Sequence, residues 1–567
     1  MTINSKSNWI LPKKTSLEEL IPFLLERRGI EDSESFLNPS LSNIPSSDLL
    51  FDTKRAAKEI LDAAKKGKKV VIHGDFDADG ISSVSILWEF LFEELATHIG
   101  KKIDVVPYIP SRVDQGYGLS QSSLEDILSL EAKLVITVDC GIRDRELIEE
   151  YMKERELNFI VTDHHQPPED LKEDLKYTIV HPMFPRKEYP EVEICGSFVV
   201  FLLIQAIRKE AGMEYEIRKE SRGLDLVALA TVTDLMPLVG VNRTLVYWGL
   251  KQIREGVRVG MNELVKVSGL ELKDIDSYHL GYILGPRVNA AGRIGSSLDG
   301  VRLFVSKKEN VCKSIANILN ETNYQRQFLT ESGIEEAEEI IGDRGEEKLL
   351  FLVSSNWHEG IVGLIAGKLN EKYHRVVLAG TDSNGEIRAS ARSIKGFNIT
   401  EALSKCDTYL KKYGGHQQAA GFTLDSKNVK RFSECIKKVA EDEITDEMLI
   451  RNINIDLLLS SNDISRELIE KIDLLKPFGN GNPKPLIALV DLVVLKKQIM
   501  GKLGNHMKLI CRGDGVDLIT LILFNCSEDI NAIDLDDRID VVGSVGINSW
   551  NGNEEVQFLV KEWKFRV

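Results

Sequence analysis

The amino-acid sequence predicts an α/β protein of several domains, with a doubly wound parallel sheet first and a small β-barrel last. Three observations predict this fold class. Strand-like and helical segments alternate over residues 51–207, helical spacing continues without proline through 299–342, and several short strands follow one another from residue 451 onward. Strands that alternate with helices are typical of parallel sheets, whereas runs of short strands are typical of barrels.

Composition and charge limit the functions that this chain can have. Its 567 residues suffice for roughly three or four domains. The net charge of -16 means that a polyanionic partner must be held by a local basic surface or by metal ions. The seven cysteines are scattered, odd in number and without CxxC spacing. The sequence therefore predicts reduced thiols in a cytoplasmic protein, with neither zinc fingers nor disulfides.

No segment is typical of a membrane protein. Residues 1–14 lack the apolar region of a signal peptide, and the most apolar stretch, residues 198–207, is too short to cross a bilayer. Residues 1–50 are expected to form a helical extension that packs without carrying chemistry. Ser16 and Glu19 are typical of a capping box before Leu20, and Pro39 and Pro45 interrupt the segment that follows.

The predicted parallel sheet has strands at 69–72, 103–107, 134–138, 159–162 and 177–180. Helices are expected between them, over 81–96, 124–130 and 145–156. In such a sheet, ligands bind beyond the carboxyl ends of the strands. The residues that directly follow each strand are therefore the first candidates for a functional site.

Three acids, Asp75, Asp77 and Asp79, follow the first strand in a turn that leads into a helix. Alternate carboxylates on such a turn can direct several oxygens at one point, which suits hard divalent cations. An EF-hand loop begins in the same way, but its twelfth position would be Ile86 instead of glutamate. We therefore expect a divalent-metal site of another kind.

Similar residues follow the third and fourth strands. Asp139 follows the third, and the triplet Asp163, His164 and His165 follows the fourth. Asp234 comes after a strongly apolar run that stops at a proline. Each acid alone could be a helix N-cap or a turn residue, and the histidines could lie in a surface turn. Because carboxyl ends of parallel strands share one edge, their joint occurrence favours a single site.

In order and spacing, these residues resemble the four motifs of the DHH phosphoesterase superfamily, which is named for its Asp-His-His triplet. Within it, the sequence is most similar to the RecJ-type single-strand-specific exonucleases. The similarity continues through 284–293 (LGPRVNAAGR), 357–363 (WHEGIVG), 390–393 (SARS) and 414–421 (GGHQQAAG), and covers most of residues 50–490. The last of these segments is the signature of the DHHA1 domain.

The resemblance implies a division of the chain into five parts. These are a helical N-terminal extension (1–50), a DHH catalytic domain (51–298), a long connecting helix (299–345), a DHHA1 α/β domain (346–445) and an OB-fold-like nucleic-acid-binding domain (446–567). Apolar residues at helical spacing over 311–340 predict one connecting helix on the order of 50 Å long, with a cleft between the joined domains. Two shorter helices with a break near Gly333 are the alternative.

Residues 387–421 could supply the local positive surface that the overall charge lacks. They hold six Lys and Arg against two acids, with Phe397, Tyr409 and Tyr413 interleaved. A hydroxyl at Ser390 and a guanidinium at Arg392 suit a phosphate group. The alternative is a solvated charged face without a ligand.

Short strands are expected at 453–459, 486–495, 506–511, 518–524, 540–547 and 556–563, with a hairpin turn at Asn551-Gly552. This pattern suits a barrel of the OB type, which often binds single strands by aromatic stacking. Phe524, Trp550 and Trp563 are the candidates for stacking, although each could equally belong to the core.

The resemblance also implies a site with two Mn²⁺ or Mg²⁺ ions. Asp139 would bridge the ions, Asp77 would bind one, and Asp79, His164 and Asp234 would bind the other. Mixed oxygen and imidazole ligands suit these ions. The resemblance further implies that Asp75 and Asp163 orient the ligands and that His165 contacts the scissile phosphate. His73 either packs or binds metal. The substrate would be held by Arg112, Arg287, Asn289, Arg293, Ser390, Arg392 and His416.

The function implied by the resemblance is 5′-to-3′ hydrolysis of single-stranded DNA to 5′-mononucleotides, in DNA repair and recombination. A monomer in the cytoplasm is expected, with a single-stranded-DNA-binding protein or a helicase as candidate partners. One alternative is a DHH phosphoesterase for short oligonucleotides or cyclic dinucleotides, which would need neither the long helix nor the barrel. Another is a non-catalytic replication scaffold, but all five candidate ligands are present. A nucleotide-driven motor is unsupported because GxxxxGK[ST] does not occur.

Overall fold

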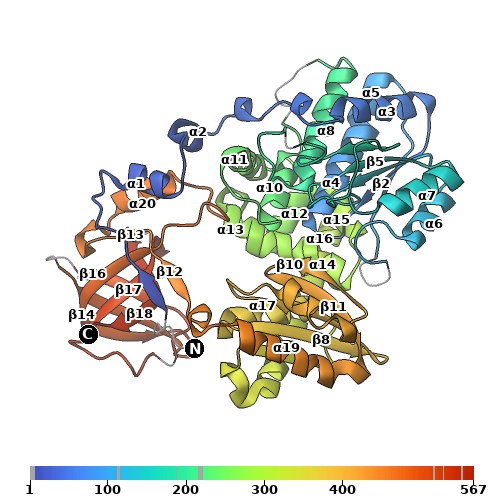
Figure 1. Ribbon diagram of the computed structural model, residues 1–567. Coiled ribbons are helices and arrows are strands. Elements are labelled where there is room, and N and C mark those ends of the chain that lie inside the picture. The colour runs from blue at the N-terminus through green and yellow to red at the C-terminus, as the bar shows by residue number, and fades with distance from the viewer. Residues whose placement is uncertain are drawn as a thin grey trace.

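The computed structural model describes residues 7–111, 115–186, 188–214, 221–514, 518–527, 529–550 and 553–566. Three domains follow one another along the chain, and a long helix joins the first to the second (Figure 1). Within these residues, no helix has both the length and the apolar composition needed to cross a membrane.

The first domain contains a five-stranded parallel sheet in the order β3-β2-β4-β5-β6. Its strands are β2 (Val70–Gly74), β3 (Val105–Tyr108), β4 (Leu134–Val138), β5 (Asn158–Thr162) and β6 (Thr178–Val180). The prediction of these strands is therefore confirmed. Both faces are covered, as the continuous β-branched and aliphatic runs require.

Alternate residues of each strand enter two separate cores. Ile72 and Ile136 pack against α3 (Thr53–Lys66), α4 (Ala78–Glu89), α8 (Gly196–Glu210) and α10 (Leu224–Thr233). Val71 and Val135 pack against α6 (Gln121–Ser129) and α7 (Arg145–Arg155) on the opposite face. The period of two thus confirms the doubly wound arrangement. The helix expected over 81–96 is α4 followed by a π-helix, η3 (Phe90–Leu95), and α5 (Ala96–Ile99).

The rest of this domain is helical and lies beside the sheet. It consists of α11 (Gly240–Arg254), α12 (Val259–Val267), α13 (Ser277–His279), the π-helix η5 (Leu280–Leu284), α14 (Gly285–Ile294) and α15 (Leu298–Val305). The apolar run before Asp234 is helix α10, so Asp234 caps the end of a helix instead of following a strand.

The connecting helix α16 (Glu309–Ile341) has 33 residues, which corresponds to a length of about 50 Å. It runs through Gly333 without interruption, so the alternative of a break there is wrong. A Cβ atom at Gly333 would lie 2.6 Å from Cδ1 of Ile365 in α17 (Val362–Tyr373). The glycine therefore serves close packing between two helices and does not end the helix.

The second domain has a mixed sheet in the order β10-β11-β9-β8-β7. Its elements are β7 (Leu349–Val353), β8 (Val376–Ser383), β9 (Glu386–Arg392), β10 (Lys412–His416), β11 (Ala419–Asp425), α17, α18 (Ile399–Ser404) and α19 (Val429–Glu443). In this sheet β7 and β8 pair in parallel, and the other pairs are antiparallel. A core lies on each face of this sheet.

The C-terminal domain is a closed barrel in the order β14-β15-β16-β18-β17, because β17 also pairs with β14. Its strands are β14 (Ile487–Met500), β15 (His506–Arg512), β16 (Leu518–Leu523), β17 (Arg538–Trp550) and β18 (Asn553–Phe565), with β12 (Asn452–Asn454), β13 (Leu457–Leu458) and α20 (Arg466–Asp473) beside them. The OB-type barrel is thus confirmed. The turn Asn551-Gly552 and the side chain of Trp550 lie outside the described residues.

The stacking candidates in the barrel differ in exposure. Trp563 is fully buried and donates a hydrogen bond from Nε1 to Asp529, so it belongs to the core. Phe524 is exposed and packs edge-on against His506. Only Phe524 of these two could offer a face to a base.

The N-terminal segment packs on the C-terminal barrel. Strand β1 (Asn8–Ile10), which the sequence did not predict, pairs in parallel with β12, and Figure 1 shows it lying against the barrel. Helix α1 (Leu20–Arg27) adds Leu20 and Leu24 to the barrel core, and α2 (Ser33–Leu37) adds Phe36. The expected capping box is incomplete, since Ser16 accepts a hydrogen bond from the amide of Glu19 but Glu19 caps α1 only through its backbone.

A buried arginine connects the first domain to the barrel. Arg243 of α11 donates hydrogen bonds to the carbonyls of Phe36, Leu475 and Lys476. Burial lowers the pKa of Arg243 to about 10, and its guanidinium lies 3.8 Å from the ring centre of Phe36. These contacts join α11 to both α2 and the segment that leads into the barrel.

The prediction that all cysteines are reduced is wrong for one pair. Cys406 and Cys435 form a disulfide across 29 residues of sequence, with Cα atoms 6.1 Å apart. The bond joins Cys406, two residues after the end of α18, to α19, and these two helices pack against each other. A pairing that depends on how two helices pack leaves no sequence motif. The other five cysteines are free and buried.

Candidate metal centre

Three neighbouring strands bring acidic and imidazole side chains to one edge of the first sheet. Strands β2, β4 and β5 lie side by side, and the polar residues follow their carboxyl ends. Three overlapping groups of candidate metal ligands form there, and within each group all ligand atoms lie within 4.8 Å of one another. The first group is Asp79, His164 and Asp234, the second is Asp75, Asp77 and Asp139, and the third is Asp139, His164 and His165.

The acids after β2 are held in a tight turn at the start of α4. Asp77 is the N-cap of this helix, and its Oδ1 accepts hydrogen bonds from the amides of Asp79 (2.9 Å) and Gly80 (3.1 Å). A Cβ atom at Gly80 would lie 2.3 Å from the carbonyl oxygen of Asp75. Only glycine therefore lets this turn close so tightly.

Asp79 is oriented by the N-terminus of helix α8. Its carboxylate accepts hydrogen bonds from the amides of Gly196 and Ser197, both at 2.7 Å, and from the Ser197 hydroxyl at 2.6 Å. A Cβ atom at Gly196 would lie 2.7 Å from Oδ1 of Asp139. The sequence reasoning missed both residues. In the sequence, the one sign of this role is that a glycine and a serine directly precede the apolar stretch 198–207.

Asp139 stands at the sharp turn after β4, with a φ of 62°, which aspartate tolerates better than most residues. Its amide donates a hydrogen bond to the carbonyl of Thr162, the last residue of β5. The turn therefore ties the ends of two strands together and brings this carboxylate to the imidazole of His164.

His164 lies at the centre of the first group. Its Nε2 is 3.1 Å from Oδ1 of Asp139, 3.6 Å from Oδ2 of Asp234 and 3.8 Å from Oδ2 of Asp79. Within the described chain, that nitrogen and the nearest oxygens of Asp139 and Asp234 are buried without a hydrogen-bond partner. Unpaired buried polar atoms that face one another are costly unless a ligand satisfies them.

The pKa shifts of these side chains also indicate that the site requires a bound cation. Burial, reinforced by neighbouring carboxylates, raises the pKa of Asp77, Asp139 and Asp234. Burial also lowers the pKa of His164. A bound divalent cation would remove this repulsion and keep the carboxylates ionised. Carboxylate oxygens with one imidazole fit Mn²⁺ or Mg²⁺.

Asp163 orients the histidine pair. Its Oδ1 accepts hydrogen bonds from the amides of His164 and His165 and lies 2.8 Å from the His165 ring, while Oδ2 accepts from the amide of Ile142. Burial raises the pKa of Asp163, but the hydrogen bond and charge of His165 outweigh it and leave this pKa below its ordinary value. Burial likewise lowers the pKa of His165, but Asp163 outweighs it and raises that pKa to about 9.

His73 lies apart from these groups. It is fully buried in β2, stacks on Tyr108 and contacts the Cys140 sulfur through Nδ1 at 3.5 Å. Burial lowers its pKa to about 4. Its Nε2 is buried without a hydrogen-bond partner among the described residues, so packing and metal binding both stay predictions for His73.

A pocket of about 550 Å³ lies between the first and second domains. Tyr117 and Arg293 line it from the first domain, and Ser390, Arg392 and Lys412 line it from the second. The two sides approach closely, since a Cβ atom at Gly360 would lie 2.4 Å from the carbonyl oxygen of Arg293. The expected cleft is therefore present, and Tyr117 was missed by the sequence reasoning. The hydroxyl of Tyr117 lies 3.0 Å from Nδ1 of His165.

The seven predicted substrate residues divide into three sets. Arg293, Ser390 and Arg392 line the pocket. Asn289 accepts a hydrogen bond from the amide of Ala78 at 2.7 Å, beside Asp77. Arg287 instead donates to Asn320 of α16 and to the carbonyl of Ile283 one turn earlier. His416 is exposed at the end of β10, and Arg112 lies outside the described residues.

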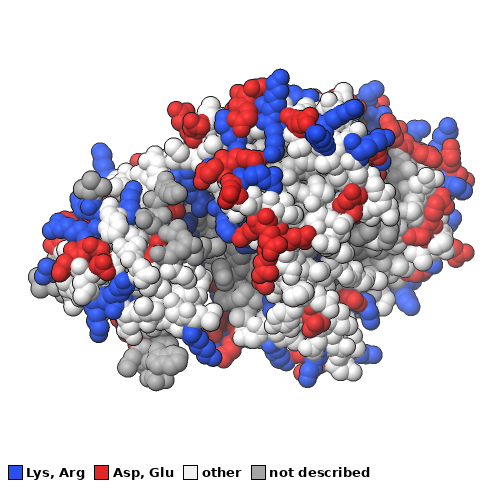
Figure 2. Space-filling model, turned by 90° about the horizontal axis from the view of Figure 1, so that it is seen from below, with Lys and Arg blue, Asp and Glu red and all other residues white. Residues whose placement is uncertain are grey.

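The predicted positive surface over 387–421 is partly neutralised by ion pairs. Arg388 pairs with Glu359 and Glu386, and Lys411 pairs with Glu386 and Asp425. Over the face shown in Figure 2, Lys and Arg are interspersed with Asp and Glu. Inside the pocket, Arg392 instead contacts the Ser390 hydroxyl at 2.8 Å, and burial lowers its pKa.

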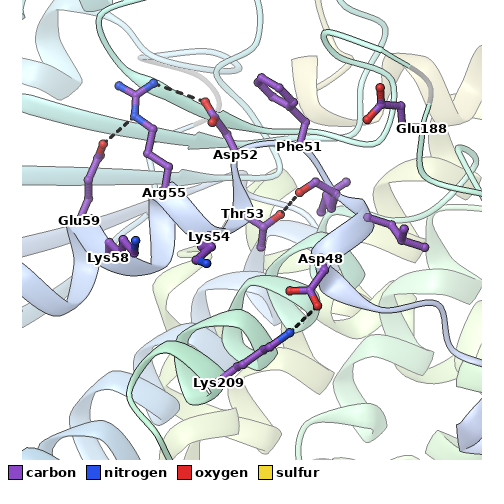
Figure 3. A pocket seen from close by; sticks show the side chains of 12 residues that line it. Asp48, Phe51, Asp52, Thr53, Lys54, Arg55, Lys58, Glu59, Glu188 and Lys209 are labelled. Carbon is purple, nitrogen blue, oxygen red and sulfur yellow. Dashed lines mark hydrogen bonds and ion pairs between the residues drawn. The ribbon is translucent and has the colours of Figure 1, made fainter.

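Another cavity, of about 940 Å³, lies at the start of α3. Five of its charged side chains pair among themselves, Asp48 with Lys209 and Arg55 with both Asp52 and Glu59 (Figure 3). Among the residues that the structure describes, none of the candidate metal or substrate residues lines it. It is therefore separate from the metal centre.

Comparison with known proteins agrees with this fold. Residues 69–231 match the model of the DHH family, N-terminal domain, residues 346–442 match the DHHA1 domain, and residues 455–562 match the RecJ OB domain. A DHH domain with a carboxylate-rich metal centre, followed by a DHHA1 domain, makes the protein a metal-dependent phosphoesterase of the DHH type.

Two relatives and one solved structure define the family more closely. The chain is 32% identical to the single-stranded-DNA-specific exonuclease RecJ of Bacillus subtilis (strain 168), over 97% of this chain and 69% of that protein. It is 30% identical to the protein of the same name from Haemophilus influenzae, over 95% of each. The crystal structure of RecJ in complex with Mn²⁺ from Thermus thermophilus is similar with a TM-score of 0.83 and 26% identity, over 99% of this chain and 80% of that one. The chain belongs to the RecJ family of single-stranded-DNA-specific exonucleases.

Proposed function

We propose that the protein is a metal-dependent 5′-to-3′ exonuclease that degrades single-stranded DNA to 5′-mononucleotides, in DNA repair and recombination. The observation that carries this proposal is the set of unpaired buried atoms of Asp139, His164 and Asp234, which lies beside a phosphate-compatible pocket. Related proteins named as single-stranded-DNA-specific exonucleases support the choice of substrate.

The metal ligands in this proposal come from the first two groups. Asp139 would be shared between two ions, Asp77 would hold one, and Asp79, His164 and Asp234 would hold the other. Asp75 belongs to the same group as Asp77 and Asp139, so it is close enough to join the first ion as well as to orient its neighbours. When bound, two such cations activate a water and neutralise charge at the scissile phosphate.

The remaining residues would position the DNA. The guanidinium groups of Arg293 and Arg392 and the Ser390 hydroxyl can hold the 5′-terminal phosphate in the pocket. His165 can donate a hydrogen bond to the scissile phosphate from Nε2, while Asp163 holds its Nδ1 atom. Asn289, which contacts the amide of Ala78 beside Asp77, would support the strand next to the metal centre. Substrate binding by Arg112, Arg287 and His416 stays a prediction of the family resemblance.

The test uses single-stranded and double-stranded DNA labelled at the 5′ or the 3′ end, digested with Mn²⁺. Wild type should release mononucleotides from the 5′-labelled single strand, and Asp139→Ala should not. Glu150→Ala changes an exposed acid of the same domain and should match wild type. Equal digestion by wild type and Asp139→Ala would refute the metal-centre proposal, and release from the 3′ end would refute the direction.

The same assay, with a dinucleotide as an additional substrate, addresses the other functions. A DHH phosphoesterase for short oligonucleotides or cyclic dinucleotides would hydrolyse a dinucleotide faster than a long strand. A non-catalytic scaffold would hydrolyse neither. The family assignment favours the exonuclease.

We also propose the five-part division of the chain at residues 50, 298, 345 and 445. The matched DHH, DHHA1 and OB segments fall inside the proposed units, which supports it. A cytoplasmic monomer that receives single strands from a helicase or a single-stranded-DNA-binding protein completes the proposal. Sedimentation and pull-down with each candidate partner would test these points.

A further inference from the structure

Two exposed tyrosines stack on each other near the junction of the first domain and the barrel. Tyr278 of α13 is 59% exposed and Tyr282 of η5 is 73% exposed. Their ring centres are 4.9 Å apart and their planes differ by 26°. Single exposed aromatic residues are common, but a stacked pair in water offers a preformed flat surface. The pair is therefore a candidate for contact with a flat ligand.

The pair lies on the same helix face as two residues of the metal centre and pocket. From α13 through α14, the positions 278, 282, 286, 289 and 293 recur every three or four residues and none is buried. Asn289 on this face contacts the amide of Ala78 beside Asp77, and Arg293 lines the pocket. The two tyrosines therefore extend the row of predicted substrate contacts.

The row runs from the metal centre toward the barrel. A Cβ atom at Gly285 would lie 2.2 Å from Thr233, so this helix packs directly on the turn of α10 that ends at Asp234. At the other end, the Ser277 hydroxyl donates a hydrogen bond to the carbonyl of Phe478, in the segment that enters the barrel. In Figure 1, α13 lies on the side of its domain that faces the barrel.

We propose that Tyr278 and Tyr282 form a base-stacking platform that holds the single strand between the metal centre and the barrel. The proposal rests on the proposed exonuclease function. Stacking suits a nuclease without sequence preference, because every base has a π-face. It also suits a chain of net charge -16, because it attracts the strand without relying on positive charge. Loss of one stacked base typically weakens binding by roughly 5- to 100-fold.

The first test measures binding of 5′-phosphorylated thymidine oligomers of about 20 and 3 nucleotides to Tyr282→Ala, Tyr278→Ala, the double alanine variant and Tyr282→Phe. We expect the preference for the long oligomer over the short one to fall about 10-fold in Tyr282→Ala and further in the double variant. Tyr282→Phe should retain it, because the ring rather than the hydroxyl stacks. Tyr247→Ala removes another exposed tyrosine, on α11, and should behave as wild type.

The second test places 2-aminopurine at successive positions of the long oligomer. A base stacked on the platform should lose fluorescence on binding to wild type and to Tyr282→Phe, and keep it with the double alanine variant. The platform proposal would be wrong if wild type and the double variant showed the same preference for the long oligomer and the same loss of 2-aminopurine fluorescence. If wild type digests single strands and these results are equal, only the platform fails. If wild type digests no single strand, the proposed function itself fails.

Discussion

The Nε2 atom of His164 lies 3.1 Å from Oδ1 of Asp139, although the two residues follow different strands. Both atoms are buried and neither has a hydrogen-bond partner among the residues described. Two further carboxylates, from Asp79 and Asp234, lie at 3.8 and 3.6 Å from the same nitrogen. A bound cation would stabilise this arrangement, because it would satisfy the unpaired buried atoms and offset the repulsion between the carboxylates.

The first prediction concerns metal binding by Asp139. Mn²⁺ at about 100 times its dissociation constant should stabilise wild type by about 2.7 kcal/mol for each bound ion, because it binds the folded state only. Asp139→Asn should lose most of this effect. Without metal, the variant should melt above wild type, because one repelling buried carboxylate has been removed. Thermal unfolding with and without Mn²⁺ measures both effects, and an equal response to Mn²⁺ in the two proteins would contradict the prediction.

The second prediction concerns the support of Asp79. Ser197→Ala removes the 2.6 Å hydrogen bond to this carboxylate but leaves the two amide contacts. Substitution of a residue that orients a metal ligand typically lowers metal affinity by about 10- to 100-fold. We therefore expect Ser197→Ala to bind Mn²⁺ about 10- to 100-fold more weakly than wild type. Ser83→Ala is the control, because Ser83 contacts the Ser197 hydroxyl at 3.1 Å but not Asp79. Isothermal titration with Mn²⁺ compares them, and similar losses in both variants would argue against a specific role.

The third prediction concerns the contact between the first two domains. Gly360→Ala would place a Cβ atom 2.4 Å from the backbone oxygen of Arg293. Because this oxygen belongs to the backbone, it cannot move aside as a flexible side chain would. We expect the pocket to widen and activity on single-stranded DNA to fall at least about 10-fold, as misplaced substrate contacts do. Gly367→Ala, where nothing lies within 4 Å, should be neutral or stabilising by up to about 1 kcal/mol. Small-angle scattering and activity together distinguish the two, and an active, compact Gly360→Ala variant would refute the argument.

The fourth prediction concerns pH. Burial raises the pKa of Asp144 from 3.8 to about 6, although its carboxylate accepts a hydrogen bond from the amide of Leu119. The folded state therefore binds a proton that the unfolded state has released between these values, so stability falls as the pH rises through this window. Asp144→Asn keeps the acceptor and removes the charge. Its melting temperature should exceed that of wild type more at pH 7 than at pH 4.5, by an amount equivalent to at most about 3 kcal/mol. A difference that does not change with pH would contradict the prediction, and Glu150→Gln serves as the exposed control.

The sequence alone was sufficient for the five strands of the first sheet, for the barrel and for the candidate ligands. The strands and the barrel depend on local signals, namely apolar residues at a period of two or of three to four. The set of metal ligands, including Asp234 at the end of a helix, came from the resemblance to the DHH superfamily. Because parallel strands share a carboxyl edge, the sequence even implied that Asp77, Asp139 and His164 lie together. The connecting helix could be predicted for the same reason, since its periodicity is continuous.

Only the tertiary structure decided the contacts between distant segments. The amides that hold Asp79 come from a helix much later in the chain, Arg287 turns to α16 instead of the pocket, and β1 joins the barrel at the other end of the chain. The disulfide between Cys406 and Cys435 likewise arises from the packing of two helices. A local pattern shows which face of an element is apolar, but the partner of that face is chosen by the packing of the whole chain.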